Sequence, residues 1–291
     1  MNSSEHKINL HTHTDFCDGK NSAEEMVLAA IEKGFEVLGF SSHSLYPFAR
    51  SWHIAPRNFQ SYETEISRLK ETYKDKIKIL LGYEGDYYPG VSIPSKKYYK
   101  SHGLNPDYLI GSVHYIVSKK GVYSVDNKTD TVRQNLIQLY GDGEHFESVN
   151  AKKAVCEYFA AEREMLKNAD FEILGHPDLI RLRNTELHYF DEGESWYKKE
   201  LKATVKAIKS AGIIVEINTG AIGRKLMDDV YPSEAFLELL YEEGIPICIN
   251  ADSHQTDTLD SAFDFAKQRA KKAGYKELVY PTGNTNFSVK L

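Results

Sequence analysis

The stretch AAIEKGFEVLGF, residues 29–40, contains the pattern that decides the fold. Its first half has apolar residues at helical spacing and ends on Gly34, a residue that closes helices because it adopts the left-handed conformation at little cost. An apolar run follows at once, which is typical of a buried parallel strand. The same order recurs in IKSAGIIVEI, YEEGIPICI and KKAGYKELVY, at residues 208–217, 241–249 and 271–280. This repetition predicts an α/β fold.

Seven strands are predicted in all, near residues 8–10, 37–40, 77–81, 109–113, 171–174, 213–217 and 245–250. A capping box starts the first long helix, because Glu25 follows Ser22 by three residues. No linker divides the strands, so residues 1–291 are interpreted as a single barrel domain. The longest gap, about residues 115–170, is interpreted as an elaborated loop that contains a helix near residues 149–168.

The composition limits the classes of partner. The 291 residues include 42 acidic and 36 basic side chains, and the net charge of −6 predicts no broad basic surface for nucleic acid or an anionic membrane. No stretch approaches the roughly 18 apolar residues that cross a bilayer, and no apolar signal core is present. The three cysteines form no recognisable disulfide or metal pattern. We expect a soluble, cytoplasmic protein of undetermined oligomeric state.

A potential metal ligand follows six of the seven predicted strands. In barrels of parallel strands the carboxyl ends converge on one face, so these residues are expected to meet there. A single histidine after a strand is more often a surface or structural residue, but that alternative explains the joint placement poorly. The candidates are His11, His13, His43, Glu84, His114, His176, Asp252 and His254.

Two of these segments have a spacing that suits chelation. His11 and His13 point to the same side of an extended chain because side chains alternate with a period of two, and Asp252 with His254 repeats that geometry. Asp18 lies a few residues after His13 and is a further candidate, although Asp-Gly also signals an ordinary turn. Mixed imidazole and carboxylate donors suit zinc, manganese or iron, and the sequence does not name the ion.

These motifs resemble the polymerase and histidinol phosphatase (PHP) superfamily, in particular its bacterial histidinol-phosphate phosphatases. The resemblance spans nearly the whole chain. It is carried by the ordered set HTHTDFCDGKNSAEEMVLAAIEKGFEVLGFSSHS, GYEGDYY, GSVHYI, GHPDL and NADSH, at residues 11–44, 82–88, 111–116, 175–179 and 250–254. It implies a distorted seven-stranded (β/α) barrel with a three-metal centre at the carboxyl ends of the strands.

The resemblance also implies which residues hold each ion. One ion takes His11, His13, Glu84 and Asp252. A second shares Glu84 and takes His114 and His176. A third takes Asp18, His43 and His254. This third set departs from the family pattern, because several histidinol phosphatases have a histidine where this chain reads CDGK.

For the activity, the resemblance implies hydrolysis of L-histidinol phosphate to L-histidinol and phosphate, a step of histidine biosynthesis. Two close cations generate a bridging hydroxide that attacks phosphorus in line. Glu84, Asp252 and His254 are the candidate catalytic residues. The proton for the leaving alkoxide comes from Asp252 or from a metal-bound water, and the sequence leaves both open.

A small phosphoester substrate also needs donors for its phosphate. Arg224, in the strand-end loop NTGAIGR, is the first candidate, with a surface arginine as the alternative. Arg183 is the second candidate, and Arg181 and Lys225 are less favoured. Asn218 ends the sixth strand and is expected either to contact substrate or to orient a ligand.

Two other functions are considered. One is a PHP phosphoesterase acting on nucleotides or oligonucleotides, and the other is a catalytically silent PHP module that uses metal for stability. The acidic balance disfavours the first, and the full set of donors disfavours the second. The remaining histidines are interpreted as loop, surface or substrate-lip residues, namely His145 in the long insertion and His6, His53, His102 and His188.

Overall fold

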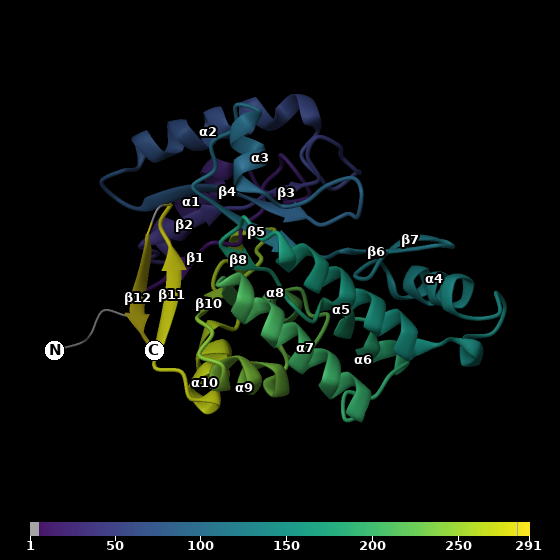
Figure 1. Cartoon of the computed structure of the whole chain (residues 1–291). Coiled ribbons are helices and arrows are strands. Elements are labelled where there is room, and N and C mark those ends of the chain that lie inside the picture. Colours follow the sequence, from purple (N-terminus) through teal and green to yellow (C-terminus); the bar gives the residue numbers. More distant parts are fainter. Residues whose placement is uncertain (1–5, 284) are drawn as a thin grey trace.

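A computed structural model describes residues 6–283 and 285–291, and its main sheet is the predicted barrel. Seven strands pair in parallel with their neighbours, each starting within two residues of its predicted position (Figure 1). In sheet order they are β1 (Ile8–Asn9), β2 (Val37–Phe40), β4 (Lys78–Asp86), β5 (Tyr108–Ser112), β8 (Ile173–Leu174), β9 (Ile214–Asn218) and β10 (Ile247–Asn250).

The first and last strands of this order meet just beyond their ends. An isolated parallel bridge joins Thr12 to Ser253. The amide of His13 donates to the carbonyl of Ser253 at 2.8 Å, and the amide of Ser253 donates to the carbonyl of His11 at 3.0 Å. The sheet is therefore a nearly closed barrel, and its closure sets the His-Thr-His segment beside the Asp-Ser-His segment.

Helices connect the strands and cover the outside of the barrel (Figure 1). The capping box is confirmed, because the Ser22 hydroxyl accepts from the Glu25 amide and the Glu25 carboxylate accepts from the Ser22 amide. The α-helices are α1 (Ala23–Glu32), α2 (Phe59–Thr72), α3 (Lys96–Ser101), α4 (Thr129–Tyr140), α5 (Ala151–Lys167), α6 (Asn184–Leu187), α7 (Ser195–Ala211), α8 (Gly220–Gly223), α9 (Glu234–Glu242) and α10 (Phe263–Ala273), and the 3-10 turns are Pro56–Asn58, Phe146–Ser148, Leu179–Arg181 and Thr256–Thr258.

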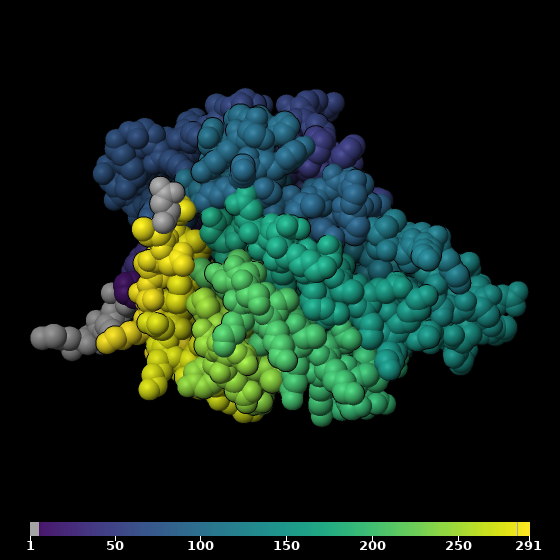
Figure 2. All heavy atoms as spheres, in the orientation of Figure 1, coloured from purple at the N-terminus to yellow at the C-terminus, as the bar shows by residue number. Residues whose placement is uncertain are grey.

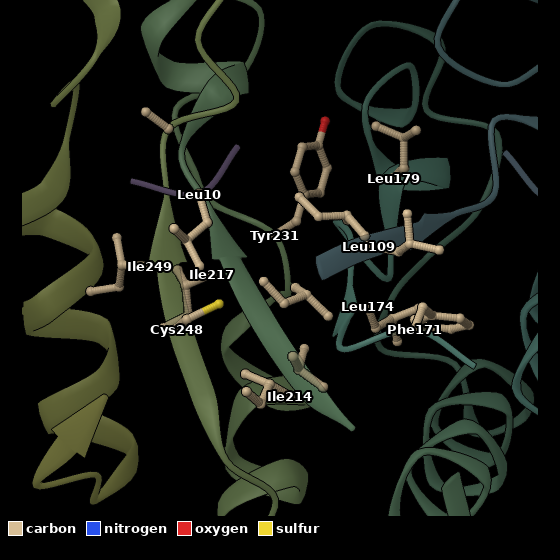
Figure 3. Packing of buried hydrophobic residues seen from close by; sticks show 14 of the residues in the cluster. Leu10, Leu109, Phe171, Leu174, Leu179, Ile214, Ile217, Tyr231, Cys248 and Ile249 are labelled. Carbon is tan, nitrogen blue, oxygen red and sulfur yellow. The ribbon is translucent and has the colours of Figure 1, made fainter. Parts of the chain in front are cut away.

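Away from the polar residues near their carboxyl ends, the strands are largely apolar on both faces, because helices cover them from outside and the opposite wall of the barrel covers them from inside. Ile217 of β9 pairs with Ile249 of β10, next to Cys248, and all three are at most 1% exposed (Figure 3). Burying each aliphatic side chain of this size contributes about 1.5–3 kcal/mol to folding. This packing makes the strand ends a stable frame for a site.

One run of the repeated helix–glycine–strand pattern, which is not among the seven listed strands, is placed differently. The segment after KKAG was expected to be a buried parallel strand, but β11 (Glu277–Pro281) pairs antiparallel with β12 (Asn286–Lys290) outside the barrel. In Figure 1 this hairpin stands at the edge of the molecule. Whether such a segment joins the barrel depends on the strand with which it pairs. A helix followed by glycine does not indicate which strand that will be.

The insertion between β5 and β8 contains more structure than the expected loop and helix. Strands β6 (Tyr115–Ser118) and β7 (Gly121–Ser124) form an antiparallel hairpin, and α4 precedes the predicted helix, which is α5. Figure 2 shows that the teal part of this segment projects at one end of the molecule. None of the helices in the described ranges combines the length and apolar character needed to cross a bilayer.

Candidate metal centre

The strand ends bring the predicted ligands together around Glu84, which lies in β4 and is fully buried. Its Oε1 lies 2.8 Å from Nε2 of His176 and 3.4 Å from Nε2 of His114. Its Oε2 lies 2.8 Å from Nδ1 of His43 and 3.2 Å from Nε2 of His11. One carboxylate therefore contacts imidazoles from four separate segments of the chain.

Asp252 completes the inner part of the centre from the last barrel strand. Its Oδ1 lies 3.1 Å from Nε2 of His13 and 3.8 Å from Nε2 of His11. The same His13 nitrogen lies 3.6 Å from Oε2 of Glu84. These contacts follow from the pairing of residues 12 and 253, which brings the two motifs side by side.

Asp18 and His254 form the outer part of the centre. Oδ2 of Asp18 lies 3.3 Å from Nε2 of His254, and its Oδ1 lies 3.8 Å from Nε2 of His43. The Asp18 side chain is 35% exposed and that of His254 is 17% exposed. The turn after Asp18 needs glycine, because a Cβ on Gly19 would lie 2.6 Å from the amide nitrogen of Thr14.

Grouped by distance, the donors form sets whose members offer atoms within 4.8 Å of one another. Three sets correspond to the ligand groups implied by the resemblance, with two differences: Glu84 is not in the set that holds His11, and the outer set also includes His13. A further set combines two expected ligands with Asp86, which was not predicted. The sets are His11, His13 and Asp252; Glu84, His114 and His176; His13, Asp18, His43 and His254; and His43, Asp86 and His114.

The donor set fits divalent cations. Nε2 of His11, Nε2 of His13 and Oε2 of Glu84 are buried atoms without a hydrogen-bond partner. Such atoms are costly to bury unless another partner satisfies them. Ligands about 2.1 Å from a tetrahedral ion lie about 3.4 Å apart, which is close to the separations found here. Buried imidazoles facing carboxylates at these distances are suited to hold an ion between them.

The charges of the centre also favour a cation. Burial disfavours the charged form of Glu84, but the neighbouring imidazoles of His43, His11 and His114 hold its pKa well below the usual value. Burial lowers the pKa of His13 to about 3, with His254 and His43 adding to the effect. Metal binding requires neutral imidazoles, which His13 already provides. The neighbouring carboxylates raise the pKa of His11, His43 and His114, so these three would release protons when an ion binds.

A pocket of about 210 Å³ opens over these donors. Arg224 lines it, and its side chain is 32% exposed. The Arg224 guanidinium lies 3.2 Å from Oδ2 of Asp252 through one nitrogen and 3.2 Å from Nδ1 of His254 through the other. The first phosphate candidate is therefore at the mouth of the donor cluster.

The other substrate-binding candidates lie outside this pocket. All three guanidinium nitrogens of Arg183 have partners, the carbonyls of Asp126 and Asn127 and the Glu186 carboxylate. Arg181 is bound to acidic side chains away from the centre. Asn218 is fully buried and donates to Oδ2 of Asp252 at 3.3 Å, which fits the second of its two expected roles, that of orienting a ligand.

Comparisons with known proteins agree with this geometry. Residues 9–220 match the PHP domain family. The chain belongs to the PHP domain family. It is 29% identical to the "Probable histidinol-phosphatase" of Schizosaccharomyces pombe, over 95% of this chain and 91% of that protein. It is 23% identical to the histidinol-phosphatase of Bacillus subtilis, over 89% of this chain and 97% of that protein.

Solved structures share the fold of this PHP domain. A Listeria monocytogenes protein aligns with a TM-score of 0.76 and 21% identity, over 89% of this chain and 99% of that one. The histidinol phosphate phosphatase of Lactococcus lactis, solved with zinc, L-histidinol and phosphate, aligns with a TM-score of 0.69 and 22% identity, over 97% of this chain and 98% of that one. The near-closed parallel barrel is thus the fold of these structures as well.

Glu216 is a residue of the PHP domain centre that sequence reasoning missed. It is fully buried in β9, and its carboxylate lies 3.0 Å from Nδ1 of His11 and accepts the backbone amide of His176 at 2.9 Å. Asn218 and Asn250 also donate to it. The signal was a glutamate inside the apolar run IIVEIN, since a charge buried in a strand needs partners.

Asp86 plays the same part on the other side of the PHP domain centre. It is fully buried, its Oδ1 accepts from Nδ1 of His114, and its Oδ2 lies 2.6 Å from Nε2 of His53. Nδ1 of His53 accepts the amide of Arg50 at 2.9 Å, so Nε2 carries the proton given to Asp86. The spacing of two residues from Glu84 along one strand could have revealed Asp86.

The prediction for His53 is therefore wrong. It was expected at the surface or the substrate lip, but it is only 4% exposed and lies behind a predicted ligand. Its partner Asp86 comes from a distant strand, so nothing near His53 in the sequence indicates burial. The other histidines outside the ligand set are exposed, as expected; they are His6, His102, His145 and His188.

Two proposed ligands of the PHP domain have unusual backbone conformations. The backbone φ is 21° at His176 and 48° at Asp252, and residues other than glycine rarely adopt positive φ values. Gly220 packs against the second of them, because a Cβ at that position would lie 2.9 Å from the Asp252 side chain. Such conformations persist where the surrounding structure holds them, and they cluster at functional sites.

Proposed function

We propose that this protein is a metal-dependent phosphomonoesterase that hydrolyses L-histidinol phosphate to L-histidinol and phosphate in histidine biosynthesis. The curated relatives named histidinol-phosphatase align along almost the whole chain, with 89–95% coverage. The Lactococcus lactis structure contains zinc, L-histidinol and phosphate. These names support the substrate, and the geometry of the centre supports the reaction class.

The observation that carries the proposal is the position of Arg224 against Asp252 and His254, in a donor cluster built around a carboxylate shared by several imidazoles. Nε2 of His176 and Nε2 of His11 face opposite oxygens of Glu84. Arg224 and His176 line one small pocket of about 210 Å³. A dianionic phosphate fits between a cationic guanidinium and a cluster built to hold cations, and the size favours a small ester over a polymer.

We propose that the centre holds three divalent ions, zinc, manganese or iron. Glu84 would be shared by the inner two, with His11, His13 and Asp252 on one side and His114 and His176 on the other. Asp18, His43 and His254 would hold the outer one. Divalent ions in such a site lower the pKa of a coordinated water and neutralise charge on the phosphoryl oxygens.

The residues of the chain have distinct tasks in this proposal. Glu84 and Asp252 keep the inner imidazoles at fixed separations, and His254 contacts both Asp252 and Arg224. Arg224 is placed to donate to the phosphate, and its contact with Oδ2 of Asp252 holds the guanidinium over the centre. Glu84, Asp252 and His254 are therefore assigned to the chemistry and Arg224 to substrate binding.

We further propose that the chain acts as one domain in the cytoplasm, on a small-molecule substrate. The test is phosphate release by the purified protein supplied with Mn²⁺ or Zn²⁺. A higher kcat/KM for L-histidinol phosphate than for mononucleotides and p-nitrophenyl phosphate is expected. A preference for a nucleotide would move the substrate to another class, and bound ions without turnover of any phosphoester would indicate a silent module.

A further inference from the structure

The pocket over the metal centre has a side that neither the donors nor Arg224 occupy. Besides those residues it is lined by Asp126 and by three leucines, Leu179, Leu182 and Leu226. The leucines offer an apolar wall for the body of a substrate. Asp126 is unexpected there, because a negative charge beside a phosphate site weakens phosphate binding unless the substrate also has a positive group.

Asp126 differs from the other carboxylates that line this pocket. Asp18 and Asp252 each belong to a donor set, whereas Asp126 belongs to none. Among residues 6–283 and 285–291, the only hydrogen-bond donor to its carboxylate is the hydroxyl of Ser124, and it forms no ion pair. Its negative charge faces His114 and Arg224 across the pocket without a direct ion pair to either, so this half-buried carboxylate has acceptor capacity left for a ligand.

The chain holds Asp126 firmly in this position. The residue lies between β7 and α4, in the insertion, and Arg183 binds its carbonyl at 3.1 Å and the carbonyl of Asn127 at 2.6 Å. Arg183 is itself only 8% exposed. This arginine was expected to contact the phosphate, but the contacts give it a positioning role, since it fixes the backbone that presents Asp126 to the pocket.

We propose that Asp126 binds the ammonium group of the substrate and makes the site specific for phosphate esters of amino alcohols. This inference rests on the proposed function, because L-histidinol phosphate carries an amine two carbons from its ester oxygen. Arg224 and Asp126 line one pocket, so a single small molecule contacts both with its opposite charges. An ionised acceptor binding a cationic donor is among the stronger hydrogen bonds of proteins.

The test compares substrates with and without the amine. The wild type and Asp126→Asn are assayed on L-histidinol phosphate and on its deamino analogue, in which hydrogen replaces the amine. Asparagine keeps an oxygen for the Ser124 hydroxyl and removes only the charge. The ratio of kcat/KM for the two substrates should fall about 10- to 100-fold in the variant, mainly through KM for the amine-bearing substrate.

Asp130→Asn is the matched control, because it removes the same charge from an exposed position four residues further on. Its ratio should equal that of the wild type. Equal losses on both substrates in Asp126→Asn, or an unchanged ratio, would overturn the inference.

Failure of the proposed function has a different signature. In that case the wild type would not prefer L-histidinol phosphate to p-nitrophenyl phosphate. The amine subsite is then decided by phosphoethanolamine and ethyl phosphate in the same variants. A ratio that falls in Asp126→Asn supports the subsite, and a ratio that stays the same rejects it.

Discussion

The inner donors around Glu84 and the outer donors around Asp18 lie in one cluster but are held in different ways. Glu84 and His11 are fully buried, and Glu216 fixes the second nitrogen of His11. Asp18 is 35% exposed and extends from a tight turn, and its carboxylate faces the imidazoles of His13, His43 and His254. Folding of the barrel therefore sets the inner geometry, whereas we expect an ion to complete the outer one.

The largest effect is expected from Glu84→Gln, which tests the inner half. The amide removes the shared negative charge, so the protein should lose at least one bound ion, and kcat/KM should fall about 1000-fold or more, because metal charge stabilisation contributes several kcal/mol. Metal content by mass spectrometry and initial rates measure this. Circular dichroism should be unchanged.

The matched control is Glu162→Gln. Glu162 is 1% exposed and lies outside every donor set, and burial raises its pKa well above the usual value, so that the amide resembles its protonated form. This variant should keep its ions and its rate. Near wild-type turnover of Glu84→Gln would reject the shared carboxylate.

A smaller effect is expected from Asp18→Asn, which tests the outer half. The variant should lose one ion while the inner ions stay bound, and kcat/KM should fall about 100-fold, since one charge near the phosphate is lost. Titration of metal content against a chelator separates the two halves. Asp15→Asn, an exposed position in the same loop, is the control. Simultaneous loss of all ions would contradict the view that the inner and outer donors bind their ions independently.

Local sequence patterns predicted one part of this molecule, and contacts between distant segments determine the other part. The strands and ligands were predictable, because glycine after a helix, apolar runs and polar residues at strand ends are local patterns. Glu216 and Asp86 were missed because their roles depend on which strands become neighbours. β11 was misassigned for a similar reason, since its partner is β12 and no local feature distinguishes a barrel strand from a hairpin strand.

The roles of residues that contact the insertion were also not predictable from the sequence. Asp126 has no motif around it, and only the folded chain brings it to a pocket built from distant strand ends. Arg183 was singled out as a charged residue near a ligand motif, but the backbone carbonyls of Asp126 and Asn127 accept its donors. Motifs thus identified the donors of the centre, whereas the residues that orient donors or shape the pocket required the structure.

A smaller effect again is expected from His53→Phe, which tests how the inner donor His114 is oriented. The variant breaks the path from Arg50 through His53 and Asp86 to His114. Because His53 is one residue further from the ion than Asp86, the loss in metal affinity and kcat/KM should be about tenfold, at the low end for outer partners. His53→Gln keeps a donor for Asp86 and should recover part of it.

Metal titrations of both variants check this, with the exposed His102→Gln as the control. A structural role alone would lower the melting temperature in both variants without separating their metal affinities. Equal affinities in His53→Phe and the wild type would show that Asp86 orients His114 without help.

The smallest effect is expected from His145→Ala, at a histidine outside both halves. Its side chain is 67% exposed, and its only ion pair, within the part of the chain described, is with Asp142 at 3.0 Å. An exposed pair of this kind contributes little, so kcat/KM should stay within about twofold of the wild type and the ion content should not change. Because the exposed histidine differs from His13 and His43 only in where the fold places it, a loss as large as that of Glu84→Gln would mean that the insertion closes over the centre and supplies a donor, and the division into inner and outer donors would then be incomplete.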